Sequence, residues 1–236
     1  MPTVLSYNLR SLRDDPSAVA RVVRTIAPDV ACLQEVPRFW TWRLQRRRLA
    51  NACGMTIAAG RRACGLAVFT APHVRRVTRE FHLLTPDKDL HRRALAVAVL
   101  EINGTRLIAA STHLDLKDEP RQRHAQEILA HLARAKARHQ APVVLAGDIN
   151  EEPGGPTWTA LTSHFHDAYE RAPTNAELTF TARTPTRRID AIFTDPTIQV
   201  TACGVPTGES LLADYPQATD HRPVLADLVL PNPQKP

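Results

Sequence analysis

Short apolar runs, many of them alternating with polar residues and bounded by Gly, Pro, Asn or Asp, occupy most of this chain. Such runs predict β-strands. We expect strands at residues 3–9, 30–36, 56–59, 66–69, 74–81, 95–102, 105–112, 143–147, 189–193, 199–203 and 224–230. Asn103-Gly104 is the preferred two-residue type I′ turn because both positions need a positive φ, so residues 95–112 predict a hairpin.

Apolar residues recur with helical spacing in four stretches between these strands. The four stretches are residues 17–27, 38–53, 120–140 and 157–161. We expect Ser17 to be the N-cap of the first helix and Thr157 that of the fourth. The second helix has Phe39, Trp42, Leu44 and Leu49 as its apolar contribution and an outer face of Arg43, Arg46, Arg47 and Arg48. Residues 83–93, 167–185 and 205–218 predict loops.

The predicted strands outnumber the helices, and at least one hairpin is present, which argues against a purely parallel doubly wound sheet. Two packed sheets with outer helices fit this order of elements better. No internal repeat, Gly/Ser linker or shift of composition divides the sequence. We therefore predict one domain over residues 1–230, followed by a disordered tail at 231–236.

The composition is that of an ordinary globular protein, with 43% hydrophobic and 23% charged residues. No apolar run is long enough to cross a membrane, and the N-terminus lacks the pattern of a signal peptide. We therefore expect a cytoplasmic protein that does not interact with membranes. Four cysteines without CxxC spacing are expected to be reduced and buried, namely Cys32, Cys53, Cys64 and Cys203.

The formal net charge is +6, and most of the cations are arginines. They form groups at residues 46–48, 61–62, 75–76, 92–93 and 187–188. Because Arg binds phosphate in a bidentate manner, one interpretation is a basic groove that faces a polyanion such as nucleic acid. The other is a solvated surface in a protein that uses Arg in place of Lys, and the sequence leaves both open.

Polar side chains lie at the ends of six predicted strands. They are Asn8, Glu35, His113, Asp148 with Asn150, Asp190, and Asp220 with His221. If Asp148 still belongs to its strand, the period of two places Asp148 and Asn150 on one face. Taken singly, each residue also fits an ordinary turn, a strand end that reaches solvent or a surface histidine.

Taken together, these residue types favour a metal-dependent phosphoester hydrolase. Carboxylate oxygens suit Mg²⁺ or Mn²⁺, amides and imidazoles suit phosphoryl oxygens, and an Asp can orient a His. A carboxylate inside an apolar strand, such as Asp190, needs a partner because an unpaired buried charge is costly. No Ser or Cys lies in a nucleophile-elbow motif, which argues against covalent acyl transfer.

Six segments, in order, carry a family resemblance: YNLR, LQEV, STHLD, GDIN, RRIDAIF and TDHRPV. Over residues 4–230 the chain resembles the endonuclease/exonuclease/phosphatase superfamily, whose fold is DNase I-like. The resemblance implies an α/β fold, a four-layer αββα sandwich of two mixed sheets with outer helices, and a site at one edge of the paired sheets.

The resemblance also implies a metal and phosphate site that binds Mg²⁺ or Mn²⁺. Glu35 is similar to the principal metal carboxylate of the family, helped by Asn8 and Asp220. Asn8 and Asn150 would contact the phosphate. Arg93 resembles a phosphate-binding arginine of the family.

The catalytic roles follow from the same resemblance. His221 would contact the scissile phosphate and help to activate water, and Asp190 would orient its imidazole. Asp148 and Asn150 would position the nucleophile or the leaving oxygen, and His113 would be the second histidine. The base is left open between His221, Asp148 and a metal-bound water.

The leading hypothesis is a divalent-metal phosphodiester hydrolase, of the nuclease type, that acts as a monomer on a phosphoester and possibly on nucleic acid. One alternative is a phosphatase or phosphodiesterase for a small phosphoester, which would share the whole site. The second is a catalytically inactive phosphate-binding module of the same fold. The complete set of strand-end polar residues argues against that module.

Overall fold

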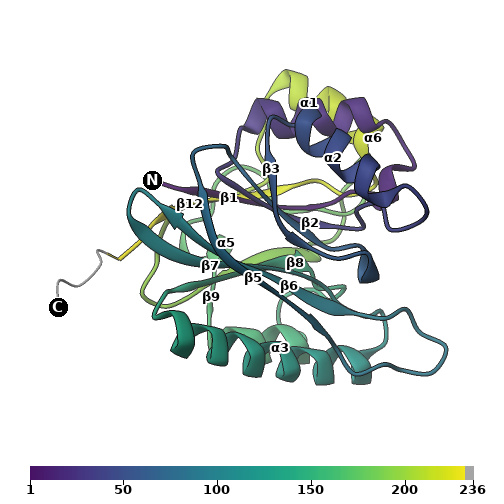
Figure 1. Ribbon diagram of the computed structural model, residues 1–236. Helices are drawn as coiled ribbons and strands as arrows, with labels where there is room; N and C mark the ends of the chain where they lie inside the picture. The colour runs from purple at the N-terminus through teal and green to yellow at the C-terminus, as the bar shows by residue number, and fades with distance from the viewer. Residues whose placement is uncertain (232–236) are drawn as a thin grey trace.

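The computed structural model describes residues 1–231 as two mixed β-sheets packed face to face between layers of helices (Figure 1). The first sheet has the order β11 (Gln199–Gly204), β12 (Val224–Val229), β1 (Thr3–Asn8), β2 (Val30–Gln34), β4 (Ala67–Thr70) and β3 (Thr56–Gly60). The second has the order β5 (Arg75–Leu83), β6 (Ala94–Ile102), β7 (Thr105–His113), β8 (Val143–Asp148), β10 (Asp190–Thr194) and β9 (His166–Asp167). Parallel pairing joins β1 to β2 and β7 to β8, and the other neighbours are antiparallel.

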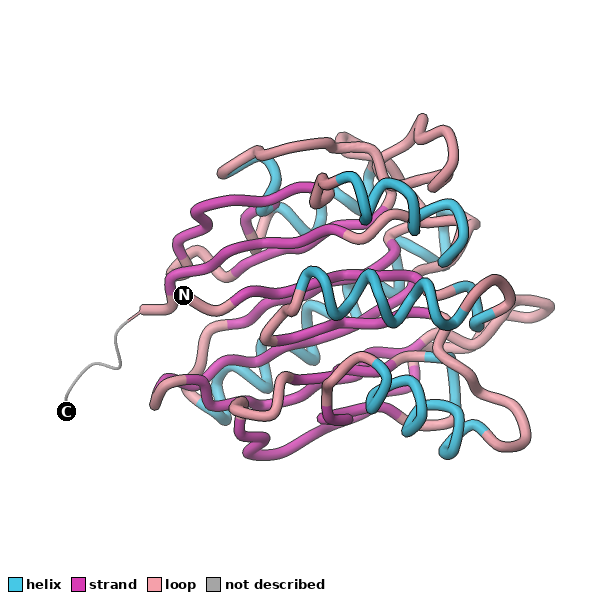
Figure 2. Tube along the Cα trace, turned by 90° about the horizontal axis from the view of Figure 1, so that it is seen from above, coloured by secondary structure: helices cyan, strands magenta, loops and turns pink. Residues whose placement is uncertain are grey.

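The helices cover the two outer faces, which confirms the four-layer αββα sandwich. The first sheet is covered by α1 (Pro16–Ile26), α2 (Trp42–Ala52) and α6 (Glu209–Ala218), and the second by α3 (Asp118–His139) and α4 (Pro156–Thr162) (Figure 1). One-turn elements complete the chain: η1 (Arg10–Leu12), η2 (Ala63–Gly65) and α5 (Ala168–Arg171). Loops join the strands at both of their ends, beside the N-terminus and at the opposite side of the molecule (Figure 2).

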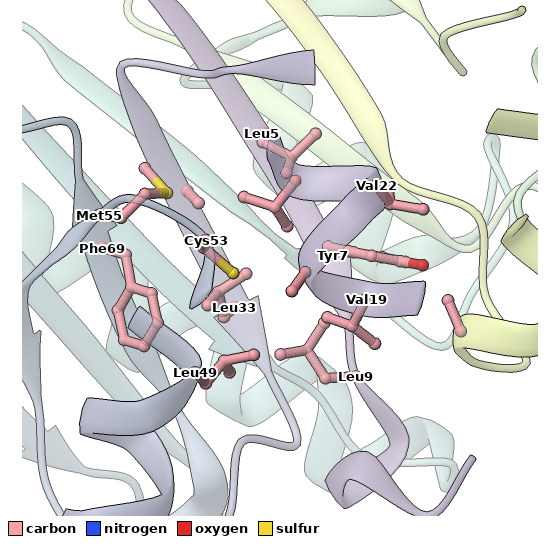
Figure 3. Close-up of a cluster of buried hydrophobic side chains, with 14 of the residues drawn as sticks. Leu5, Tyr7, Leu9, Val19, Val22, Leu33, Leu49, Cys53, Met55 and Phe69 are labelled. Carbon is pink, nitrogen blue, oxygen red and sulfur yellow. The ribbon is translucent and has the colours of Figure 1, made fainter. Parts of the chain in front are cut away.

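The two-residue period of the strands divides the apolar side chains between the outer layers and the space between the sheets. In β1, Leu5 and Tyr7 pack beneath the helices (Figure 3), whereas Val4 packs between the sheets. In β8, Leu145 packs beneath α3 and Ala146 packs between the sheets. The same period therefore directs Asn8 and Asp148, the last residues of these strands, into the space between the sheets.

Three local predictions were wrong. The loop predicted at 205–218 contains α6, which buries Leu211 and Tyr215 against the first sheet and was hidden by its polar composition. The N-cap of α1 is Asp15, whose carboxylate accepts from the Ser17 amide, because Pro16 occupies the first helical position. The N-cap of α4 is Gly155 rather than Thr157. The Asn103-Gly104 turn has the expected positive φ values, 50° and 79°.

The predicted orientation of the second helix was also wrong, because α2 begins at Trp42 rather than at residue 38. Phe39 and Leu44 are exposed, whereas Arg46 is only 1% exposed. The Arg46 guanidinium donates hydrogen bonds to the carbonyls of three residues, Pro37, Arg61 and Leu66, at 2.7, 2.9 and 3.3 Å. Arg46 therefore joins the start of α2 to two neighbouring loops.

Arg188 is a second arginine of the predicted basic groups that is buried rather than solvated. It stacks over the rings of Trp158 and Tyr169, at 4.9 and 5.1 Å from their centroids. It also pairs with the Asp167 carboxylate at 3.0 Å. Two of the predicted arginine groups, residues 46–48 and 187–188, therefore each include a buried arginine that does not contribute to the surface charge.

The remaining expectations concern cysteines, membranes and the tail. The four cysteines are free, and three of them are buried, whereas Cys64 is half-buried. Within residues 1–231, no helix combines the length and the apolarity that crossing a bilayer would require. The predicted disorder of the tail concerns residues that, from 232 onward, lie outside the described part of the chain.

Substituting Arg46 tests its role in stability. Arg46→Ala should lower the free energy of unfolding by about 2–4 kcal/mol, since three carbonyls, two of them in buried hydrogen bonds, lose a charged donor. The exposed neighbour Arg47→Ala is the matched control and should change it by less than about 0.5 kcal/mol. Urea denaturation of both variants measures the difference, and equal stabilities would contradict the structural role.

Candidate active site

The site is centred on Asp148, the last residue of β8. In the second sheet, Asp148 is the register partner of His113 on β7 and of Asp190 on β10. The Asp148 side chain is 1% exposed, and its Oδ2 lies 3.5 Å from His113 Nε2. From the opposite sheet, Asn8 Nδ2 donates to the same oxygen at 2.9 Å. Residues distant in sequence thus meet at one buried carboxylate.

A glycine makes this approach possible. A Cβ on Gly147 would lie 2.3 Å from the backbone oxygen of Thr112, closer than any side chain can come. Because β7 and β8 are adjacent at this point, only glycine allows the strand to pass and to deliver Asp148 beside His113. The Gly-Asp pair of the GDIN segment is therefore required by packing as well as by chemistry.

His221 and Asp190 form a buried pair next to Asp148. Asp190 Oδ2 accepts from His221 Nδ1 at 2.8 Å, which leaves Nε2 directed toward Asp148, 3.8 Å from its Oδ2. The ring of Phe180 lies 5.0 Å from the imidazole ring, centroid to centroid. The other oxygen of Asp190, Oδ1, is buried without a hydrogen-bond partner. The pair holds the imidazole in one orientation, with its outer nitrogen toward the site.

Glu35 lies immediately beyond the end of β2 and is half-buried. Its backbone has a φ of 49°, a left-handed conformation that is uncommon for a residue with a Cβ. Glu35 Oε1 lies 3.3 Å from Asn8 Nδ2, so one amide group contacts both Glu35 and Asp148. Asn8 Oδ1 accepts from the Arg10 amide at 3.0 Å. In this orientation Asn8 presents its nitrogen to the two carboxylates.

Asp220 is at the rim of the site and is already paired. Its Oδ2 lies 3.2 Å from Arg10 Nε, and its Oδ1 accepts from Thr219 Oγ1 at 3.3 Å. Oδ1 is also 4.0 Å from His221 Nε2. Asp220 thus belongs to the same cluster as His221, with Arg10 as its cation.

Asn150 does not share a strand face with Asp148, because β8 ends at Asp148 and Asn150 has a φ of 56°. Instead, the backbone N–H of Asn150 donates to Asp148 Oδ1 at 3.0 Å, as in an Asx turn. The side-chain Nδ2 of Asn150 donates to the Leu114 carbonyl. The expectation of one shared face was therefore wrong. The turn nevertheless keeps Asn150 beside the carboxylate.

Arg93 is mostly buried, and its Nε lies 3.4 Å from Asp115 Oδ2. Asp115 itself is 3% exposed and also accepts from the Lys117 amide. The sequence analysis did not single out Asp115 as a site residue. The signal that could have identified it is its place in the STHLD segment, two residues after His113.

The environment gives the two histidines opposite protonation tendencies. Burial and the nearby charges of Arg93 and His221 hold the pKa of His113 well below its usual value. Burial alone would also lower the pKa of His221, but the charge and hydrogen bond of Asp190, with the charge of Asp148, raise that pKa to about 10. Burial and the charge of Asp190 raise the pKa of Asp148. At neutral pH His113 is neutral and His221 is an imidazolium.

The donor atoms of this cluster fit a divalent metal ion. Asp148, Asp190 and His221 each place one ligand atom within 4.8 Å of the others. Glu35 and Asp220 add two carboxylates at the rim. Oxygen-rich groups of this kind suit Mg²⁺ or Mn²⁺, and a cation would offset the crowding of negative charge. Asp190 is already hydrogen-bonded to His221. Glu35 is therefore the carboxylate of this cluster whose oxygens are most available to a metal ion.

A four-layer αββα sandwich with carboxylates, amides and histidines converging at one edge defines a phosphoester hydrolase class. The chain belongs to the Endonuclease/Exonuclease/phosphatase family, whose sequence model matches residues 5–221. The three activities in that family name all cleave phosphoester bonds. No curated protein sequence matches the chain.

Solved structures agree with this fold. A mannosyl-6-phosphatase from Bacteroides thetaiotaomicron is 21% identical and superimposes with a TM-score of 0.82, covering 97% of this chain and 100% of that one. An endonuclease/exonuclease/phosphatase from Beutenbergia cavernae is 25% identical, with a TM-score of 0.73 and coverage of 97% and 71%. The human Nocturnin catalytic domain, solved with a bound sulfate anion, is 19% identical, with a TM-score of 0.73 and coverage of 98% and 93%.

The protonation of His221 can be tested in the metal-free protein. Asp190→Asn removes the charge that opposes burial, so the pKa of His221 should fall. In the wild type, the stability that this raised pKa contributes is fully present below pH about 6.5 and is lost as the pH rises toward 10. NMR titration of the imidazoles measures the change, with the exposed His164 as the control that should not move. An unchanged His221 would contradict the pairing.

Proposed function

We propose that this protein is a divalent-metal-dependent phosphodiester hydrolase with nuclease-type activity. The observation that carries the proposal is the convergence of Asn8, His113 and His221 on the single buried carboxylate of Asp148. A phosphate bound at this edge would meet an imidazolium, a neutral imidazole and an amide. Those are the groups that bind phosphoryl oxygens and transfer protons.

Glu35 would be the main ligand of Mg²⁺ or Mn²⁺, with Asp220 close enough to assist. When bound, such an ion polarises phosphoryl oxygens as a Lewis acid. Asn8 would hold Glu35 and Asp148 in place through its amide nitrogen, and would offer its oxygen to the ion only after the amide turns over. Asn8 therefore acts first as a positioning residue in this proposal.

Asp148 would accept the proton of the attacking water, since its raised pKa brings it nearer to the working pH of a general base. His221, held by Asp190, would donate a charged hydrogen bond from Nε2 to a phosphoryl oxygen. Neutral His113 would contact the phosphate on the other side of Asp148, and Asn150 and Arg93 would complete the phosphate site. The bond from water to phosphorus would form as the ester bond breaks, and the leaving oxygen would depart with the bonding electron pair and take a proton from solvent.

The second candidate is a phosphatase or phosphodiesterase for a small phosphoester. The structural similarity to a mannosyl-6-phosphatase favours considering it, and it would use the same central residues. An inactive phosphate-binding module is the weaker alternative, because burying Asp148, Asp190 and His221 has a folding cost that catalysis explains. The proposed enzyme would be a cytoplasmic monomer.

Removing the Glu35 carboxylate tests the metal assignment. Glu35→Gln should weaken Mn²⁺ binding by more than about tenfold, the loss that even an indirect partner of a metal can produce. Calorimetric titration with Mn²⁺ measures the affinity, and hydrolysis of bis-p-nitrophenyl phosphate should fall in parallel. Asp227→Asn, a half-buried carboxylate on β12, is the control that should retain both. Unchanged Mn²⁺ affinity in Glu35→Gln would move the metal to another carboxylate.

A double-mutant cycle tests the His221–Asp190 pair. Asp190→Asn should reduce kcat for bis-p-nitrophenyl phosphate by at least about 100-fold, because the imidazole loses its orienting carboxylate. His221→Ala should cost at least as much. The double variant should lose little beyond the worse single one, since groups that act as a unit are not additive. Losses that multiply would show two independent residues.

A further inference from the structure

The loop between β2 and α2, which follows Glu35 in the chain, exposes two aromatic side chains. Trp40 is 94% exposed and Phe39 is 63% exposed, only a few residues after Glu35. Trp40 also has a φ of 40°, which is strained for a bulky residue. The exposure of the Trp40 ring and the strain of its backbone both oppose folding. Within residues 1–231, no contact that buries this ring offsets them. An outlier of this kind points to function.

Hydrogen bonds hold this loop in place. Arg46 donates to the Pro37 carbonyl at 2.7 Å, and the Val36 amide donates to the Gly65 carbonyl at 2.9 Å. Arg62 Nε donates to the Arg38 carbonyl at 3.3 Å. The loop is therefore held against Arg62 and Gly65, at the two ends of η2. Its tip, with Phe39 and Trp40, remains exposed to solvent. The exposed rings are presented by a fixed support.

Cations lie on this loop and on the loop between β5 and β6. The Arg38 guanidinium is 5.1 Å from the Phe39 ring centroid. Arg92 and His91 are exposed on the loop between β5 and β6, whose ends are closed by a Leu84-to-Arg93 backbone bond. Within residues 1–231, Arg93 pairs with Asp115, whereas Arg38 and Arg92 form no ion pair.

Packing brings the two loops together at η2. Cys64 of η2 packs against the buried cluster of Leu66, Ala94 and Ala96, and Ala94 directly follows Arg92 and Arg93 in the chain. A Cβ on Gly65 of η2 would lie 3.4 Å from the Glu35 Cα, so η2 also lies beside Glu35. Arg38 and Arg92 therefore belong to two loops that meet at η2, next to the proposed metal ligand.

We propose that Trp40, with Arg38 and Arg92, forms a subsite for the nucleotide that flanks the scissile phosphate of a single-stranded nucleic acid. The base would stack on Trp40, and its phosphate would bind the two unpaired arginines. This proposal rests on the proposed function, because the scissile phosphate must lie beside Asp148.

The chemistry favours this occupant over two others. A sugar monophosphate has a single phosphate, which the central site would take, leaving Arg38 and Arg92 without a partner. A duplex hides its bases from a ring at the rim. A single strand supplies both a second phosphate and an unpaired base, the combination that charged grooves with aromatic side chains recognise.

Binding without catalysis is the direct test. Fluorescence anisotropy in EDTA would measure the affinity for a labelled octathymidylate and for an abasic chain of the same length. Trp40→Ala should weaken octathymidylate binding by about 5- to 100-fold, the range for loss of one stacked base, and should leave the abasic chain unchanged. Arg92→Ala should weaken both. Controls are Arg134→Ala, exposed on α3, and Leu212→Ala, exposed on α6, and neither should weaken binding.

Kinetics separate this subsite from the central chemistry. With Mg²⁺, Trp40→Ala should lower kcat/KM for octathymidylate in proportion to the lost affinity and leave hydrolysis of bis-p-nitrophenyl phosphate unchanged. Equal affinity of Trp40→Ala and Arg134→Ala would overturn the proposal, as would a loss of hexose 6-phosphate hydrolysis in Trp40→Ala. If no phosphoester is cleaved but Trp40-dependent binding persists, the proposed function fails and the subsite stands.

Discussion

The hydrogen bond from Asn8 to Asp148 connects the two sheets at the point where the chemistry lies. A buried carboxylate is stable only when other groups satisfy it. Asp148 obtains those groups from both sheets and from the Asn150 turn, so its position depends on the packing of the whole sandwich. Gln34 and Ser111 form a second polar contact between the sheets at 3.0 Å, one residue before Glu35. The central site therefore requires both sheets to be in register.

The sequence predicted this arrangement where a strong period was present. Strands with two-residue alternation and a polar last residue can have only one register if their apolar residues are to be buried. That constraint explains why the fold class was correct and why Asn8, His113 and Asp148, the last residues of their strands, converge. Asp190 is the first residue of β10 and meets them because β10 is antiparallel to β8. The position of Asn150 was predicted wrongly because β8 ends at Asp148, and the turn that follows has no regular side-chain period.

Arginine was the residue type that the sequence could not place. Arg46, Arg121 and Arg188 are all buried, each holding backbone carbonyls or carboxylates, although a count of charges assigns them to the surface. The distinction depends on contacts with residues distant in sequence, such as Arg61 for Arg46. The missed helix α6 has the same cause, because only packing against α1 and β1 reveals Leu211 and Tyr215 as its inner face.

Substrate choice in such a site must come from its rim. In the proposed mechanism the central groups would act on one phosphate and its attacking water, which phosphomonoesters and phosphodiesters share. A diester differs by what continues beyond the scissile bond, so discrimination requires surface groups that contact the next unit of the chain. Only binding energy gained outside the reacting phosphate can separate these substrates. Trp40, Arg38 and Arg92 lie outside the central cluster and have unused contact capacity. In the subsite that we propose, the loops after β2 and β5 would select the substrate.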